Sequence, residues 1–191
     1  IGAVNTVVNP AGRLWGTNTD WLGVKRSLEE AGLQLEGKRA VVVGAGGAAR
    51  AVVYALQEMG AEVEIYNRTL ERAQALARTL GGRAFPLGEI PRAQGEIIIQ
   101  TTSVGLKSWE SPVPAEIFRR FKAAMDLVYV PLKTRFLCEA AAAGCLIIDG
   151  LRMLVHQGTE QFRLFTGREA PVELMYQAAL KELKRGEKKG D

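Results

Sequence analysis

The middle of the chain alternates short apolar segments with longer amphipathic ones, and this alternation limits the possible folds more than any other feature. It predicts βαβ units, because each buried strand needs a helix that covers it and returns the chain to the next strand. The apolar run Arg39–Val43 predicts a strand buried on both faces, and Ala48–Met59 has the spacing of an amphipathic helix. Residues 20–150 are therefore expected to form an α/β domain with a Rossmann-like, doubly wound parallel sheet.

The same alternation predicts the other elements of this domain. Further strands are expected at Val63–Tyr66, Arg83–Phe85, Glu96–Gln100, Ala124–Val128 and Leu146–Ile148. Further helices are expected at Trp21–Ala31, Leu70–Leu80 and Thr134–Ala143.

The two ends of the chain depart from this pattern. Ala3–Asn9 and Arg13–Thr17 flank Pro10-Ala11-Gly12 and predict a hairpin. From Leu151 onward the spacing is helical, with a second helix near Val172–Lys184 and a frayed, basic tail over residues 184–191. We therefore divide the chain into residues 1–19, 20–150 and 151–191, and expect the outer two parts not to belong to the central domain.

Composition excludes several classes of protein. A net charge of +4 is too small for the dense basic face of a nucleic-acid-binding protein, and the longest apolar runs are far shorter than a membrane span of about 20 residues. Cys138 and Cys145 have neither the pattern of a disulfide framework nor metal-ligand spacing. We expect reduced, packed thiols, no metal site and a cytoplasmic location.

A glycine-rich segment follows the predicted strand Arg39–Val43 and opens the next predicted helix. It matches the dinucleotide-binding pattern G-x-G-x-x-G/A, in which Gly44 allows a tight turn, Gly46 lets the backbone approach a pyrophosphate, and Ala49 lets the helix pack closely on the strand. Free amides at the start of the helix would hold the anion. The predicted cofactor-binding residues of this loop are Gly44, Ala45, Gly46, Gly47 and Ala48.

The end of the next predicted strand indicates which dinucleotide binds. An NAD site usually has a carboxylate there, whereas this chain has Asn67, Arg68 and Thr69, with Arg72 one turn into the helix. Guanidinium groups suit a 2′-phosphate, so we predict NADP(H). The alternative, that Arg68 and Arg72 are only solvated charges, places positive charge at a helix N-terminus, where the helix dipole opposes it.

Seven motifs in the same order resemble those of the shikimate dehydrogenase family. They are Ala3-Val4-Asn5-Thr6, Asn18-Thr19-Asp20, Gly44–Ala49, Asn67-Arg68-Thr69 with Arg72, Thr101-Thr102-Ser103-Val104-Gly105, Asp126-Leu127-Val128-Tyr129 with Pro131, and Asp149-Gly150 with Met153-Leu154-Val155 and Gln157. The resemblance implies reversible NADPH-dependent reduction of 3-dehydroshikimate to shikimate, in aromatic amino-acid biosynthesis. It also implies that residues 1–19 and 151–191 belong to a second, substrate-binding domain, between whose parts the cofactor domain is inserted.

The resemblance also implies roles for individual residues. The implied substrate-binding residues are Asn5, Asp20, Tyr129 and Gln157, and the implied cofactor contacts are Thr101, Thr102, Ser103, Leu127, Gly150 and Met153. Simpler interpretations stay open: a strand-edge amide for Asn5, a solvated helix face for Gln157, a half-buried strand-end aromatic for Tyr129, core packing for Leu127 and Met153, and a polar turn for residues 101–104.

The resemblance further implies a catalytic Lys–Asp pair, whose aspartate matches Asp20. The alternative for Asp20 is a helix cap, since Asn18, Thr19 and Asp20 are all good N-cap residues. The family's lysine belongs to an N-terminal segment that this chain lacks, so we expect these residues alone to be inactive. His156, the only histidine, is expected to point away from Gln157, partly exposed, and so not to replace the lysine.

Four residues depart from the family pattern: Gln100, Leu106, Val130 and Arg152. Arg152 replaces a usual glycine and is expected to crowd the nicotinamide or to bias the choice of acid. Quinate or a related acid is therefore an alternative substrate, and a non-catalytic NADP-binding regulatory module is an alternative function. Apolar residues at the start of the chain, such as Val4, Val7 and Val8, are expected to be exposed and to favour a homo-oligomer.

Overall fold

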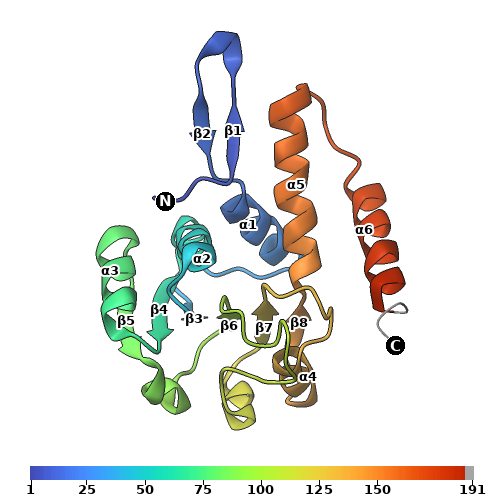
Figure 1. Cartoon of the computed structure of the whole chain (residues 1–191). Helices are drawn as coiled ribbons and strands as arrows, with labels where there is room; N and C mark the ends of the chain where they lie inside the picture. Colours follow the sequence, from blue (N-terminus) through green and yellow to red (C-terminus); the bar gives the residue numbers. More distant parts are fainter. Residues whose placement is uncertain (188–191) are drawn as a thin grey trace.

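The computed structural model describes residues 1–187 and contains one six-stranded parallel sheet (Figure 1). Its strands are β3 (Arg39–Val43), β4 (Glu62–Asn67), β5 (Arg83–Pro86), β6 (Ile97–Gln100), β7 (Ala123–Asp126) and β8 (Leu146–Ile148). The spatial order is β5-β4-β3-β6-β7-β8, which is the order of a dinucleotide-binding fold. The predicted Rossmann-like sheet is therefore confirmed, and its connectivity reverses between β3 and β6.

Within residues 1–187, the chain also forms six helices and three short 3-10 segments. The helices are α1 (Asp20–Glu30), α2 (Gly47–Glu58), α3 (Leu70–Leu80), α4 (Arg135–Ala142), α5 (Gly150–Thr166) and α6 (Val172–Glu187). The 3-10 segments, which the sequence pattern did not predict, are η1 (Pro10–Gly12), η2 (Leu87–Arg92) and η3 (Ala115–Arg120).

The sheet lies between two layers, with α1, α2 and α5 on one face and α4 on the other (Figure 1). Successive side chains of a strand point to opposite faces, so Ala40 and Val42 pack with the first layer and Val41 and Val43 with the second. All four are almost fully buried. A strand apolar on both faces is what this arrangement requires.

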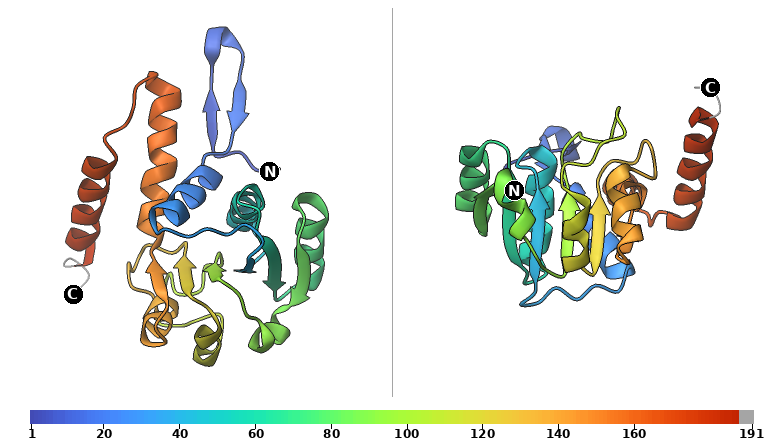
Figure 2. Two further views of the ribbon diagram at one scale, coloured as in Figure 1. Left: turned by 180° about the vertical axis from the view of Figure 1, so that it is seen from behind. Right: turned by 90° about the horizontal axis from the view of Figure 1, so that it is seen from below.

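The ends of the chain lie beside the sheet. β1 (Thr6–Val8) and β2 (Trp15–Thr17) form the predicted hairpin, shorter than the sequence suggested, which extends away from the sheet (Figures 1 and 2). Val4 and Val7 are exposed as expected, whereas Val8 is half-buried. Self-association stays a prediction, as does the division into 1–19, 20–150 and 151–191.

Helix α5 packs along α1, and α6 packs beside α5 (Figure 2). The backbones of α1 and α5 come very close at Gly23, where a Cβ atom would lie 2.6 Å from the Met153 carbonyl oxygen. Helix α6 continues through Glu187, beyond the predicted end near Lys184, while the fraying of the tail stays a prediction and residues 188–191 lie outside the described part. None of the helices within residues 1–187 is both long and apolar enough for a membrane span.

Strand β7 ends earlier than predicted. The sequence suggested Ala124–Val128, but the strand ends at Asp126, whose carboxylate accepts a hydrogen bond from the Val128 amide at 2.9 Å. This contact turns the backbone out of the sheet, so Leu127 and Tyr129 belong to the loop that follows.

Candidate functional site

The glycine loop has the geometry that its motif predicts. Gly44 has φ +115°, and a Cβ atom there would lie 2.4 Å from Oγ1 of Thr101, so only glycine fits. By contrast, nothing lies within 4 Å of the Cβ positions of Gly46 and Gly47, which face open space. Helix α2 begins at Gly47 without a side-chain cap. Its first amides are thus free to bind an anion that approaches the loop.

The end of β4 carries the residues predicted to select the dinucleotide. The Asn67 side-chain amide donates to the Thr69 carbonyl at 2.8 Å, which shapes the turn into α3. Arg68, Thr69 and Arg72 are exposed, and no ion pair involves either arginine within residues 1–187. Two unpaired guanidinium groups beside the glycine loop suit a phosphate on the adenosine ribose.

The turn after β6 is held from inside the protein. Thr101 Oγ1 donates to the Val43 carbonyl at 2.8 Å, and the buried Gln100 side chain donates to the Val104 carbonyl at 2.8 Å. Gln100 also accepts a hydrogen bond from the Thr102 amide, while Ser103 is exposed. Residues 101–104 therefore form the polar turn that the sequence allowed. The approach of Thr101 to Gly44 places this turn beside the glycine loop.

A hollow of about 330 Å³ brings most of the predicted substrate and nicotinamide residues together. It is lined by Asn5, Asp20, Ala48, Leu127, Tyr129, Gly150, Met153, Leu154, Gln157 and Gln161. Leu154 and Gln161 were not predicted to line it. Their signal was present in the sequence, because Gly150, Leu154, Gln157 and Gln161 recur at intervals of three or four and so share one face of α5.

A network of polar side chains joins the hairpin to the start of α1. The Asn5 side chain donates to Asp20 Oδ1 at 2.8 Å and to Thr19 Oγ1 at 3.1 Å. Its carbonyl oxygen accepts from the Thr19 amide at 2.8 Å and from Thr6 Oγ1 at 2.9 Å. Thr19 Oγ1 also lies 3.3 Å from Oε1 of Gln157 on α5. Three elements distant in sequence therefore meet at one polar centre.

Asp20 is not the cap of α1. The capping contacts come from Asn18, whose Oδ1 accepts from the Asp20 amide at 3.0 Å and from the Trp21 amide at 3.4 Å. The Asp20 carboxylate is left to line the hollow. Partial burial raises its pKa above the ordinary value, and the hydrogen bond from Asn5 partly offsets this effect. Among residues 1–187, no lysine lines this hollow or pairs with Asp20.

Arg152 and His156 behave differently from the prediction. Arg152 does not line the hollow; its guanidinium lies 3.3 Å from Glu30 and stacks 3.8 Å from the centre of the Tyr176 ring. His156 was expected to be partly exposed but is buried against α1, with Nε2 3.0 Å from Glu30 Oε2. The two differences have one cause. Helices α1 and α6 pack against the face of α5 that carries Arg152 and His156, and the sequence pattern did not indicate this packing.

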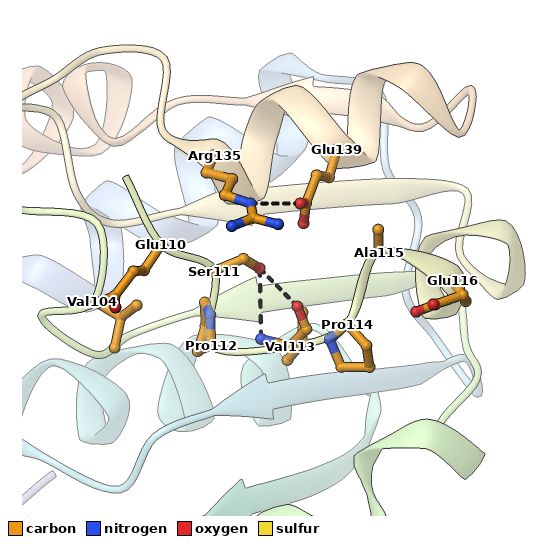
Figure 3. A pocket seen from close by; sticks show the side chains of 10 residues that line it. All are labelled: Val104, Glu110, Ser111, Pro112, Val113, Pro114, Ala115, Glu116, Arg135 and Glu139. Atoms are coloured by element: carbon orange, nitrogen blue, oxygen red, sulfur yellow. Dashed lines mark hydrogen bonds and ion pairs between the residues drawn. The ribbon is translucent and has the colours of Figure 1, made fainter. Parts of the chain in front are cut away.

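A second hollow, of about 570 Å³, lies between α4 and the long loop after β6 (Figure 3). Arg135 and Glu139 face each other across one turn of α4 at 2.6 Å, and Ser111 Oγ donates to the Val113 carbonyl. None of the predicted site residues lines this hollow. In the part of the chain that the structure describes, no cluster of three or more His, Cys, Asp or Glu side chains is arranged to hold a metal ion.

Comparisons with known proteins show which sequences and folds this chain is similar to. The family model "Shikimate / quinate 5-dehydrogenase" matches residues 25–109, and "Shikimate 5'-dehydrogenase C-terminal domain" matches residues 150–180. A solved shikimate 5-dehydrogenase from Thermus thermophilus, in complex with NADP(H) and shikimate, is 47% identical with a TM-score of 0.86. The match covers 94% of this chain and 68% of that one. The chain belongs to the shikimate dehydrogenase family.

Other members of the family show how much of a relative this chain represents. It is 52% identical over 184 residues to the shikimate dehydrogenase (NADP(+)) of Thermococcus kodakarensis, and the match covers 94% of this chain and 66% of the relative. The match to the Moorella thermoacetica enzyme of the same name is 47% identical and covers 92% of this chain and 64% of the relative. The chain thus spans slightly less than two thirds of these curated relatives.

Proposed function

We propose that this chain binds NADP(H) at the carboxyl edge of its sheet and forms part of a shikimate dehydrogenase. The reaction would be the reversible reduction of 3-dehydroshikimate to shikimate. The observation that carries the proposal is that Ala48, from the glycine-rich segment, lines the same hollow as Asp20 and Gln157. A dinucleotide held at the glycine loop would therefore reach the polar centre built by the hairpin, α1 and α5.

The residues present fit such a cofactor. The open Cβ positions of Gly46 and Gly47 leave room for a pyrophosphate at the start of α2. Arg68 and Arg72 would hold the 2′-phosphate, with Asn67 and Thr69 shaping the turn, and Thr101, Thr102 and Ser103 would lie along the adenosine side. Leu127, Gly150 and Met153 would flank the nicotinamide. When bound, NADPH supplies the hydride for reduction of a carbonyl.

The substrate side of the proposal rests on the polar centre. Asn5, Tyr129 and Gln157 would hydrogen-bond the ring hydroxyls, and Asp20 would hold and orient the group that exchanges the hydroxyl proton. Reduction of a carbonyl needs such a proton donor close to the substrate oxygen. Since no lysine pairs with Asp20 within residues 1–187, we propose that these residues by themselves bind the cofactor without turning substrate over.

The test is a titration of the chain with NADPH and NADH, followed by addition of shikimate and NADP⁺. NADPH should bind at least about tenfold more tightly than NADH, because a charge-assisted pair with the 2′-phosphate contributes about 1.5 kcal/mol or more. No NADPH should form after shikimate is added. Arg68→Ala and Arg72→Ala should each reduce the preference for NADPH, whereas Asp20→Asn should leave it intact. Equal affinity for the two cofactors would refute the roles of the arginines.

A further inference from the structure

A fully buried carboxylate lies next to the nicotinamide side of the hollow, and neither the proposed reaction nor the predicted site uses it. Asp126 ends β7, directly opposite Gln100 of β6 in the sheet register, and is 0% exposed. Its Oδ1 accepts from the Val128 amide at 2.9 Å, and its Oδ2 accepts from Thr134 Oγ1 at 2.6 Å. Thr134 is itself buried and caps α4 by accepting from the Leu137 amide. One carboxylate therefore ties together the end of β7, the loop after it and the start of α4.

The segment that Asp126 holds forms a wall of the candidate site. Leu127 and Tyr129 flank Val128, and both line the hollow. The Leu127 and Asp126 carbonyl oxygens lie 2.5 and 2.9 Å from the Cβ position of Gly150, so α5 begins in direct contact with this backbone. Met153 and Gln157 of α5 line the same hollow. A displacement of the loop would consequently move its own lining residues, Leu127 and Tyr129, together with the lining residues of α5.

This arrangement is costly for stability. Burial raises the pKa of Asp126 to about 6, although the hydrogen bonds from Thr134 and Val128 work in the opposite direction. An apolar pair of similar volume would avoid that cost. A buried charge with a perturbed pKa beside a ligand-binding hollow is more typical of a functional constraint than of packing alone.

We propose that Asp126 and Thr134 are positioning residues that hold Leu127, Tyr129 and the start of α5 in the arrangement that receives the nicotinamide half of the cofactor. The inference rests on the proposed function, since it assigns the nicotinamide to this hollow. Neither residue touches the cofactor; both act through the backbone of residues 126–129.

The experiment compares two ligands by isothermal titration calorimetry. NADP⁺ contains both halves of the cofactor, whereas adenosine 2′,5′-bisphosphate contains only the adenosine half with its 2′-phosphate. Thr134→Val removes the hydroxyl that binds Asp126 while keeping the side-chain shape. It should weaken NADP⁺ binding by about tenfold and leave adenosine 2′,5′-bisphosphate binding within about twofold. Thr134→Ser, which keeps the hydroxyl, should restore most of the affinity.

Two further variants serve as a control for Thr134→Val and as an alternative to it. Thr79→Val makes the same substitution on the exposed face of α3, where the hydroxyl binds only the Ala75 carbonyl, and it should change neither affinity. If Thr134→Val does not fold, Asp126→Asn gives a second route, because the Asn oxygen still accepts from the Val128 amide whereas its nitrogen cannot accept from the Thr134 hydroxyl. This variant should weaken NADP⁺ binding and spare adenosine 2′,5′-bisphosphate binding in the same way.

The outcomes separate this inference from the proposed function. Equal weakening of both ligands by Thr134→Val, or no weakening of either, would overturn the positioning role while the cofactor proposal stands. An unaltered protein that binds neither ligand would overturn the proposed function and this inference with it.

Discussion

The close approach of α1 and α5 at Gly23 can be tested directly by Gly23→Ala. A Cβ atom there would lie 2.6 Å from the Met153 carbonyl oxygen and 3.0 Å from the Gln157 Cβ. Neither obstacle is the far end of a flexible side chain, so the helices must separate by several tenths of an ångström. Asp20 and Gln157 lie on these two helices, so the polar centre would open as well.

The magnitude follows from two opposing effects. Overpacking a tight contact costs about 1–3 kcal/mol, and alanine in place of glycine inside a helix returns about 0.5–1 kcal/mol. From the centres of these two ranges, Gly23→Ala should lower the free energy of unfolding by roughly 1.2 kcal/mol. For a chain of this size, that corresponds to a fall in Tm of about 2–5 °C. Urea unfolding and thermal melts followed by circular dichroism would measure it.

The matched control is Gly158→Ala in the middle of α5. There the nearest atom to the new Cβ is Met175 Cε at 3.5 Å, an ordinary contact. This variant should keep the gain in helix propensity without the clash and raise stability by about 0.5–1 kcal/mol. If Gly23→Ala proved as stable as Gly158→Ala, the backbone contact between the helices would not be what sets their separation.

Two further predictions concern buried or paired charges. Arg152→Ala removes the contacts with Glu30, Glu173 and the Tyr176 ring, so it should lower the free energy of opening of α6 by about 1 kcal/mol and speed amide hydrogen exchange there. The affinity for NADPH should stay within about twofold. A clear rise in this affinity would mean that Arg152 crowds the cofactor. Burial raises the pKa of Asp126 to about 6, so folding favours the protonated carboxyl group. The ionised carboxylate therefore lowers the free energy of unfolding by up to about 3 kcal/mol above pH 6, and this destabilisation disappears as the pH falls toward 4. The stability of Asp126→Asn relative to the unaltered protein, measured by urea unfolding, should therefore decrease as the pH falls from 7 to 4; a constant difference would contradict the assignment.

Most of the fold was predictable because the sheet is covered on both faces. Strands β3 and β6 are apolar except for Arg39 at the start of β3 and Gln100 at the end of β6, and the helices between strands carry a regular apolar spacing, so local pattern and tertiary burial agree. The glycine loop was predictable for a similar reason, since Gly44 meets a steric demand that only glycine satisfies.

The features that the sequence did not reveal depend on side-chain contacts, local or between distant segments, that apolar spacing does not indicate. The end of β7 is set by a side chain returning to the backbone, and the burial of His156 depends on Glu30 from a helix 126 positions earlier. Arg152 was expected to crowd the nicotinamide because it replaces a usual glycine of the family pattern, yet its neighbour Met153 lines the hollow and adjacent residues on a helix point about 100° apart. Which of the two faces the site is decided by how α5 rotates against α1, and local patterns carry little information about that rotation.

The hydrogen bonds of Asn5 have a consequence for any ligand of this site. Both amide hydrogens and both carbonyl lone pairs of this exposed side chain are already used, by Asp20, Thr19 and Thr6. A substrate hydroxyl that takes a hydrogen bond from Asn5 must therefore displace one of these partners. Such binding is an exchange of partners, so a hydroxyl bound by Asn5 would gain little net affinity from this hydrogen bond. The exchange would free an acceptor on Thr19 or Asp20, so a ligand at Asn5 would also change the hydrogen bonding of one of these two residues.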